Sequence, residues 1–239
     1  MMRLLPWEEL PASMRTPEVR AYYDILARRR AALAAKRAFD MLASALMLVL
    51  LSPLFLGLTI AIRADSPGPV FYRQTRVTQY GREFRIHKFR SMVDGADRKG
   101  TLVTVSGDAR VTRVGQFIRR FRLDEISQLI DVLKGDMTFV GTRPEVPKYV
   151  AAYTPEMMAT LLLPAGVTSL ASIMYKDEAA LLDAAADADR VYVEEVLPGK
   201  MAYNLEGIRR FSLWDDLRLM VMTVLAMLGK EYAADRPAA

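Results

Sequence analysis

The chain has 239 residues, which predicts one domain, or one domain with attachments, and 52% hydrophobic against 26% charged residues excludes a disordered protein. The absence of cysteine excludes disulfides, thiol nucleophiles and zinc–thiolate sites, and a single histidine excludes a multi-histidine metal centre. A net charge of +5 in so apolar a chain indicates an anionic membrane surface or an anionic substrate, with nucleic acid as a rival partner.

Residues 1–37 predict a basic amphipathic N-terminal helix. Its apolar residues recur at roughly helical spacing: Val19, Tyr22, Tyr23, Leu26 and Leu33. Five basic residues gather towards its end: Arg28, Arg29, Arg30, Lys36 and Arg37. A solvated helix on the surface of the domain is the alternative.

Residues 41–62 form an uncharged apolar run. Its 22 residues are enough to cross about 30 Å of hydrocarbon as a helix. The run starts too late for a cleavable signal peptide. A buried core helix is the alternative, but a core helix of this length usually has a polar face, and this run has none. The sequence therefore favours membrane insertion.

The flanks of this run favour a re-entrant segment over a spanning one. Basic residues lie on both sides, and positively charged flanks tend to stay in the cytoplasm. Ser52 and Pro53 lie near the middle, where proline removes a helix hydrogen bond and a serine hydroxyl can satisfy a freed carbonyl. We expect residues 38–62 to form a helix–break–helix hairpin that enters and leaves by the same face. A kinked spanning helix is the alternative.

Residues 63–239 predict a helix-rich α/β catalytic domain on the cytoplasmic side of the membrane. Short strands are expected near 70–72 and 84–87, joined by a turn at 80–82. Apolar periodicity predicts helices over 114–121 and 126–133, the second ended by Gly135. The apolar segment 213–228 is a core helix or an interfacial helix on the membrane.

Asp124 and Glu125 stand at the start of the second of these helices. Asp is a favoured N-cap, and the positive end of a helix keeps a carboxylate ionised. Arginines suited to phosphate precede the pair: Arg110, Arg113, Arg119, Arg120 and Arg122. Paired carboxylates beside arginines suit phosphoryl transfer, in which one attacks or binds metal. With no cysteine and one histidine, carboxylates must hold any metal, which favours Mg²⁺ with Mn²⁺ as a substitute. The alternative is an N-cap beside a solvated arginine face.

Basic and aromatic residues alternate over residues 84–92, which include Lys88 and Arg90. This pattern fits a nucleotide site or nucleic acid, and equally an edge strand with one wet face. His87 is a candidate base, although a lone histidine beside an apolar strand is more often structural.

The chain resembles the bacterial sugar transferase family of small monotopic polyprenyl-phosphate phosphoglycosyl transferases. The resemblance covers residues 36–228, with many motifs in the family's order. They are Lys36-Arg37-Ala38-Phe39-Asp40, Ser52-Pro53, Asp65-Ser66-Pro67-Gly68-Pro69-Val70-Phe71, Arg73-Gln74, Arg76-Val77, Lys88-Phe89-Arg90-Ser91-Met92, Thr112-Arg113-Val114-Gly115, Leu123-Asp124-Glu125, Gln128-Leu129, Val132-Leu133-Lys134-Gly135-Asp136-Met137, Val140-Gly141 and Arg143-Pro144-Glu145.

The resemblance implies that a sugar 1-phosphate moves from a nucleotide diphosphate sugar, usually a UDP-sugar, to polyprenyl (undecaprenyl) phosphate with release of UMP. It implies a re-entrant helix at Ser52-Pro53, a Mg²⁺ requirement, and an Asp124–Glu125 dyad in which Asp124 forms an aspartyl phosphosugar. Glu125 would help to hold metal or manage a proton. Direct attack by polyprenyl phosphate, with Asp124 only a metal ligand, is the alternative. The expected location is the cytoplasmic face of the bacterial inner (plasma) membrane, beside anionic lipids. The candidate substrate contacts are Lys88, Arg113, Arg143 and Asp177.

The chain departs from the family in one segment and two single positions. In residues 165–177 the family's Trp, Gln, Asn, Gly and Arg are replaced, while Gly166, Thr168 and Asp177 remain. Thr142 replaces a proline, and Asn204 stands where Asp is common. Since the dyad is intact, we expect activity, while the altered segment leaves the choice of sugar and the binding of uridine open.

Two other classes of protein compete with the enzyme. A non-enzymatic basic adaptor on the membrane surface would release no UMP. A nucleic-acid-binding protein would bind DNA or RNA in a salt-dependent way, but it leaves the apolar run unexplained, so we expect no nucleic acid partner. The sugar, the glycan pathway and the oligomeric state stay open.

Overall fold

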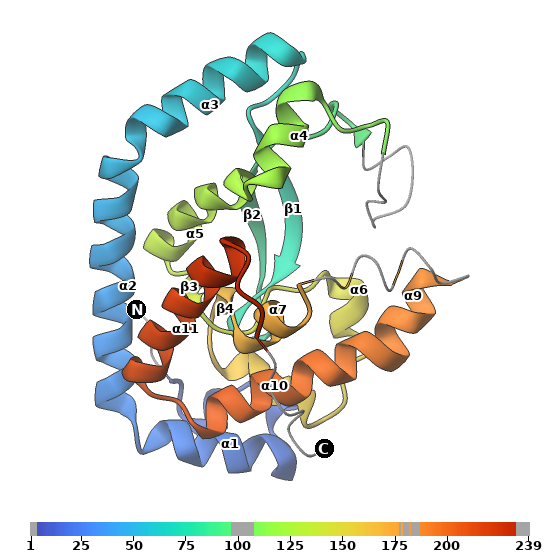
Figure 1. The fold of residues 1–239 in the computed structure, drawn as a ribbon. Coiled ribbons are helices and arrows are strands. Elements are labelled where there is room, and N and C mark those ends of the chain that lie inside the picture. The colour runs from blue at the N-terminus through green and yellow to red at the C-terminus, as the bar shows by residue number, and fades with distance from the viewer. Residues whose placement is uncertain (1–3, 97–107, 177, 179–181, 183–186, 233–239) are drawn as a thin grey trace.

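The computed structural model describes residues 4–96, 108–176, 178, 182 and 187–232. These residues form a helix-rich α/β fold around two small sheets (Figure 1). The fold class expected from the sequence is confirmed at this level. The strands are β1 (Phe71–Val77) and β2 (Glu83–Phe89), which pair antiparallel, and β3 (Met137–Val140) and β4 (Ala165–Thr168), which pair parallel.

The N-terminal region differs from the single helix expected over residues 1–37. Two 3₁₀ turns, η1 (Trp7–Glu9) and η2 (Ala12–Met14), precede α1 (Pro17–Ala27). Thr16 caps α1 by accepting a hydrogen bond from the backbone N–H of Val19. The apolar face of α1 is buried in a core cluster rather than solvated, because it packs against η6 (Met157–Leu162). Arg30 begins the next helix, so the second half of the basic group belongs to that helix.

The apolar run is a bent pair of helices, α2 (Arg30–Leu50) and α3 (Ser52–Asp65), with 61° between them. Pro53 lies in the first turn of α3, where its missing N–H costs no helix hydrogen bond. Ser52 Oγ donates to the carbonyl of Val49 at 2.7 Å, as expected for a hydroxyl beside a break. Judged by length and composition, this pair is sufficient to cross a membrane, whereas none of the helices in the described part of the chain is sufficient alone.

Between the β1–β2 hairpin and the second sheet, the described residues form α4 (Arg113–Arg120), η5 (Leu123–Gln128) and α5 (Leu129–Lys134), and β3 follows. The two predicted helices are therefore present, but the second begins as a 3₁₀ helix. Gly135 ends α5 with φ +92°, a left-handed conformation that glycine adopts without strain.

Polar groups anchor α2 to the domain. Asp40 is fully buried and accepts a hydrogen bond of 2.6 Å from Thr138 Oγ1 of β3. Arg37 donates to two carbonyls at the end of α5 and so satisfies groups that the helix leaves unpaired. Lys36 Nζ lies 2.5 Å from Asp216 of α11 (Leu213–Met227). Lys36 and Arg37, which precede the apolar run, therefore hold the first half of α2 against the domain.

The C-terminal half wraps these elements with α6 (Pro147–Val150), η6, α7 (Leu170–Met174), α9 (Ala188–Val191), the π-helical turn η7 (Tyr192–Val196), α10 (Leu197–Arg209) and α11. The segment 213–228 was expected to be a core helix or an interfacial one. No residue of α11 is fully buried, and 77% of Trp214 is exposed, so α11 is not a core helix. Only its inner side, with Leu219 and Met220, packs against a core cluster.

Candidate active site

A cavity of about 980 Å³ lies between the β1–β2 hairpin, the segment that follows β2, and η5. Asp124, Glu125 and Lys88 all line it. Its wall is strongly basic, with further cations at Arg73, Arg76, Arg85, Arg90, Arg110, Arg119 and Arg122. Such a wall suits a ligand that carries several negative charges, because guanidinium groups match phosphate oxygens.

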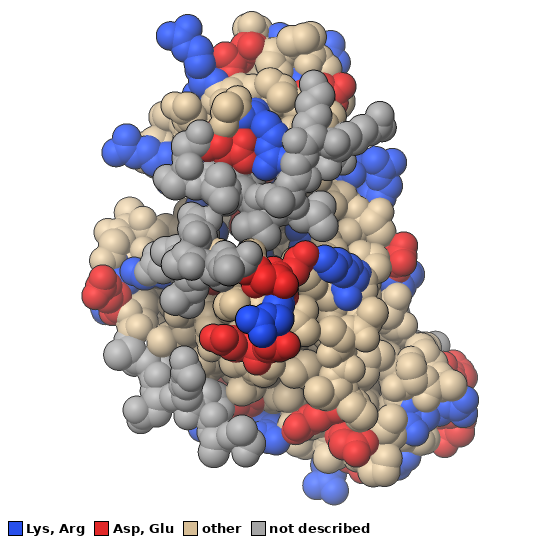
Figure 2. All heavy atoms as spheres, turned by 90° about the vertical axis from the view of Figure 1, so that its right-hand side faces the viewer, with Lys and Arg blue, Asp and Glu red and all other residues tan. Residues whose placement is uncertain are grey.

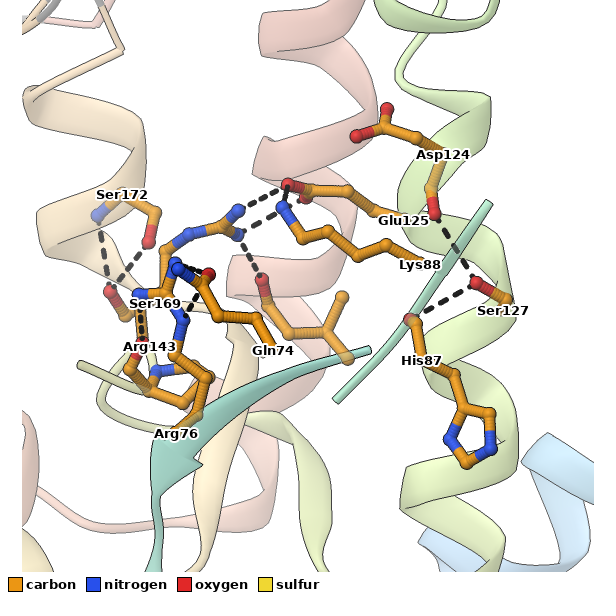
Figure 3. Close-up of polar contacts among 12 residues, drawn as sticks. Gln74, Arg76, His87, Lys88, Asp124, Glu125, Ser127, Arg143, Ser169 and Ser172 are labelled. Atoms are coloured by element: carbon orange, nitrogen blue, oxygen red, sulfur yellow. Dashed lines mark hydrogen bonds and ion pairs between the residues drawn. The ribbon is translucent and has the colours of Figure 1, made fainter. Parts of the chain in front are cut away.

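The dyad is held against β2 by two side chains that follow it. Asp131 Oδ2 accepts from the backbone N–H of His87 at 2.8 Å. Figure 3 shows the second bond, in which Ser127 Oγ donates to the His87 carbonyl at 3.0 Å. These bonds satisfy the outer edge of β2 and fix the register between the strand and η5. Lys88, the next residue of β2, thereby lies opposite Glu125.

Glu125 is held by two cations. Arg143 donates from both terminal nitrogens to the two carboxylate oxygens, and Lys88 Nζ donates to Oε1 at 3.0 Å (Figure 3). Burial alone would raise the pKa of Glu125, but the charges and hydrogen bonds of Arg143 and Lys88 hold this pKa well below its usual value of 4.5. Glu125 is therefore ionised and already occupied by protein partners.

Asp124 has the opposite environment. Among the described residues no side chain donates to its carboxylate, and the only dashed line at Asp124 in Figure 3 reaches its backbone oxygen. Burial raises the pKa of Asp124 above 3.8, the charge of Lys88 lowers it, and the charge of Glu125 raises it. Asp124 is thus the carboxylate of the pair that is available to a ligand.

The expectation that Asp124 caps a helix is wrong. Arg122 takes the cap position with a left-handed φ of 51°, and Asp124 lies in the first turn of η5. The position of Asp124 in this first turn does not lower its pKa overall, because burial outweighs the favourable groups and raises the pKa.

The structure separates the other predicted site residues. Arg143 joins Lys88 at the dyad from the segment after β3. Arg113 is exposed at the start of α4 and lies outside the cavity wall formed by the described residues. Asp177 lies outside the described residues. The ring of His87 is buried, with Nδ1 2.5 Å from Asp131 Oδ1, which is a structural role.

The donor set at the dyad fits a magnesium ion held partly by substrate. No group of three or more His, Asp or Glu side chains within the described residues could hold a metal alone. Mg²⁺ usually takes one or two carboxylates together with water and substrate phosphates. Asp124 is such a carboxylate, since no described side chain donates to it and it faces a cavity suited to phosphate.

The sequence model of the family described as "Bacterial sugar transferase" matches residues 31–230. The chain belongs to the bacterial sugar transferase family. The match covers the bent helix pair α2–α3, the β1–β2 hairpin, the Asp124–Glu125 dyad and α11, so the whole candidate site lies within the region that the family model describes.

Named relatives agree with this membership. The chain is 37% identical over 196 residues to the UDP-N-acetylgalactosamine-undecaprenyl-phosphate N-acetylgalactosaminephosphotransferase of Aeromonas hydrophila, covering 81% of this chain and 43% of that protein. It is 35% identical over 201 residues to the UDP-glucose:undecaprenyl-phosphate glucose-1-phosphate transferase of Caulobacter vibrioides, covering 83% and 71%. The Escherichia coli protein of the latter name is 34% identical over 193 residues, covering 79% and 39%. The chain thus spans less than half of two of these transferases.

Sequence reasoning missed two parts of this bacterial sugar transferase site. Ser127 and Asp131 were not recognised as the groups that dock η5 and α5 on β2, and their i, i+4 spacing after the dyad is the signal that could have drawn attention to them. Gln74 and Arg76 were noted only as part of the family resemblance, although both line the cavity. Their i, i+2 spacing on a strand places both on one face.

Proposed function

We propose that this bacterial sugar transferase moves a sugar 1-phosphate from a UDP-sugar to undecaprenyl phosphate, or a similar polyprenyl phosphate, and releases UMP. The observation that carries the proposal is the unequal dyad: Glu125 is bound by two cations, while Asp124 has no side-chain donor among the described residues and faces a basic cavity. The printed activities of the relatives from Aeromonas hydrophila and Caulobacter vibrioides support the choice of donor and acceptor.

In the first step an oxygen of the Asp124 carboxylate attacks the phosphorus that carries the sugar. The bond from this phosphorus to the bridging oxygen of the diphosphate breaks, and UMP leaves with the electron pair. An aspartyl phosphosugar remains on the enzyme. Lys88, which bonds Glu125, and Arg119 both carry charges that lower the pKa of Asp124, and they favour the ionised nucleophile and the charged diphosphate beside it.

In the second step a phosphate oxygen of polyprenyl phosphate attacks the same phosphorus. The bond to the Asp124 oxygen breaks, and the carboxylate is regenerated. Glu125 stays ionised because of Arg143 and Lys88, so its part is to hold these two cations in place beside Asp124 rather than to attack.

Asp124, together with substrate phosphates, would hold Mg²⁺. The ion would offset the charge of the diphosphate and polarise its oxygens. In the chain itself, Lys88 and the cavity arginines supply positive charge of the same kind, and they position the phosphates before attack.

We further propose that α2 and α3 form a re-entrant hairpin on the cytoplasmic face of the bacterial plasma membrane. Large apolar side chains stand exposed on both helices, which is unusual for a surface that faces water. They include Leu42, Leu46, Val49, Leu50, Leu56 and Ile60. The exposed side of α11, with Trp214 and Leu228, adds an interfacial face.

The distribution of charged side chains also supports an orientation in which α2 faces the membrane. Figure 2 looks at the side of the molecule opposite α2, and charged side chains of both signs are gathered there next to one another. Arg28 and Arg30, at the junction of α1 and α2, are exposed beside the proposed hairpin. Basic side chains in this position suit anionic lipid headgroups.

Purified protein in lipid nanodiscs with undecaprenyl phosphate and Mg²⁺ tests the activity. UDP-N-acetylgalactosamine and UDP-glucose are supplied separately, and UMP and the lipid product are measured. We expect UMP and a polyprenyl-diphosphate sugar with at least one donor, and loss of both products in excess EDTA. Failure of every UDP-sugar tried to give UMP would contradict the proposed function, and full turnover in EDTA would contradict the metal requirement.

A further inference from the structure

The side-chain amide of Gln74 has only one orientation that its surroundings allow. Its Oε1 accepts two hydrogen bonds from Arg76, at 3.0 Å from Nε and at 2.6 Å from Nη2 (Figure 3). A guanidinium group carries donors only. The amide oxygen must therefore face Arg76, and the NH₂ group must occupy the other end of the amide.

Arg76 is itself held in place. Its remaining terminal nitrogen, Nη1, donates to the carbonyl of Pro144 at 3.0 Å. Burial lowers the pKa of Arg76, and the charge of the neighbouring buried Glu145 opposes this shift. Glu145 accepts a hydrogen bond of 2.5 Å from Tyr192 and lies 3.5 Å from Lys200 Nζ. This supported arrangement fixes the orientation of Gln74 before any ligand arrives.

The NH₂ group of Gln74 is free to serve a ligand. Gln74 is half-buried and lines the cavity, and its Nε2 donates to no other group in the described part of the chain. Two N–H donors held in a fixed orientation at a cavity wall are typical of a side chain that binds an acceptor oxygen of a ligand.

Sheet geometry places Gln74 near the reaction centre. Tyr72 and Gln74 project to one face of β1, and Tyr72 pairs with Lys88 across the hairpin. Gln74 and Lys88 are therefore diagonal neighbours, whose separation in a sheet is about 7–8 Å. Since Lys88 bonds Glu125, the part of a substrate within reach of Gln74 is the part next to the dyad.

We propose that Gln74 donates a hydrogen bond to an acceptor oxygen of the transferred sugar 1-phosphate, and that it is a substrate-positioning residue set by Arg76. The inference rests on the proposed function. A carbonyl or hydroxyl oxygen of the sugar and an oxygen of its phosphate offer the same acceptor chemistry. The proposal assigns no contact between Gln74 and the leaving UMP, which therefore serves as the reference ligand in the tests below.

Gln74→Glu is the main variant, because it keeps the shape and the acceptor for Arg76 but removes the NH₂ donors. Gln74→Met removes the donors without adding charge. Thr75→Val is the matched control, since Thr75 is exposed on the same strand and projects to the other face. The thermal unfolding midpoint of each variant shows whether the hairpin stays intact.

Turnover and binding are both measured. For Gln74→Met we expect kcat/KM for UDP-sugars to fall about three- to thirtyfold, the range of one lost hydrogen bond, and Gln74→Glu to lose more. The inhibition constant for UMP should stay within about twofold of the wild-type value in both variants. A change in the ratio of kcat/KM between UDP-N-acetylgalactosamine and UDP-glucose would assign the oxygen to the sugar, and an equal loss for both would assign it to the phosphate.

Calorimetry separates this inference from the proposed function. In an Asp124→Asn background, where no turnover occurs, Gln74→Met should weaken UDP-sugar relative to UMP by the same factor. Unchanged relative affinity, or equal weakening of UMP, would overturn the role of Gln74 even if the wild type turns over. Failure of the Asp124→Asn protein to bind any UDP-sugar would also overturn the role of Gln74. If the wild type releases no UMP but Gln74→Met still alters the relative affinity, only the proposed function is contradicted.

Discussion

Arg143 grips Glu125 with both ends of its guanidinium fork, although the two residues lie on opposite sides of α5 and β3 in the chain. Lys88 bonds the same carboxylate from β2. These bonds link the β1–β2 hairpin, η5 and the segment after β3. They also leave the Glu125 carboxylate fully engaged with protein side chains. Asp124, one residue earlier, is left to the cavity.

Replacing Arg143 tests this division of labour. Arg143→Met should lower the free energy of unfolding by about 1–3 kcal/mol, because it leaves a half-buried carboxylate with Lys88 alone. It should also lower kcat/KM by at least about tenfold. Chemical denaturation and UMP release measure the two effects. Arg210→Met removes an exposed arginine that directly follows α10, and it should change the free energy of unfolding by no more than about 0.5 kcal/mol and kcat/KM by no more than about twofold. Equal effects of the two variants would contradict the role of Arg143.

Asp124→Asn should abolish UMP release and yet stabilise the protein. Burial raises the pKa of Asp124 in the folded state, so the folded protein binds this proton more tightly than the unfolded chain does. The ionised carboxylate thus costs stability above its folded pKa, and the neutral amide removes that cost at pH 7. We expect the unfolding midpoint to rise by roughly 1–4 °C, as is common when a functional charge is removed. A lower midpoint at pH 7, with the difference unchanged at pH 4, would contradict this account.

The raised pKa of Asp124 also predicts the acid limb of the pH–rate profile. Only the ionised carboxylate attacks, so the rate falls as pH drops through this pKa, and the fall should occur at a pH above 3.8. Lys88→Met removes the charge that lowers this pKa, and it should move the limb to higher pH. If the acid limb of Lys88→Met stays at the wild-type pH, the limb does not report the ionisation of Asp124, and this assignment is contradicted.

Local pattern predicted much of the scaffold. Alternation and a turn located the β1–β2 hairpin, apolar spacing located α4 and α5, and Gly135 marked the end of α5. Ser52 and Pro53 predicted the break between α2 and α3, because proline and a neighbouring hydroxyl act within one turn of the chain. These features depend on residues that are close in sequence.

Tertiary contacts decided what the sequence could not predict. Arg122 adopts a left-handed conformation that carries no composition signal, so the start of η5 was misplaced. The opposite pKa directions of Asp124 and Glu125 come from burial and from which of the two Arg143 reaches after the chain has passed through β3. Arg113 was a plausible phosphate contact by motif, yet it is exposed at the start of α4 and lies outside the cavity wall formed by the described residues.

The proposed re-entrant hairpin predicts a single-sided topology. Cysteines introduced at the exposed positions Ala35 and Ala64 of this cysteine-free chain should both react with an impermeant thiol reagent from the cytoplasmic side only. Pro53→Leu removes the break and should favour a straighter, spanning helix. Pro198→Leu, a proline at the start of α10, serves as the control and should leave the labelling unchanged. Labelling of the two cysteines from opposite sides of the membrane would contradict the hairpin.

The covalent role of Asp124 is tested most directly by the mass of the protein after reaction with a UDP-sugar in the absence of polyprenyl phosphate. The account predicts UMP release of up to one equivalent and a mass gain of one sugar phosphate on the proteolytic peptide that contains Asp124. The gain should be absent in Asp124→Asn and should disappear when polyprenyl phosphate is added. A preparation that turns over with acceptor, but without it forms no adduct and releases no UMP, would contradict the covalent mechanism and leave Asp124 as a ligand of the metal.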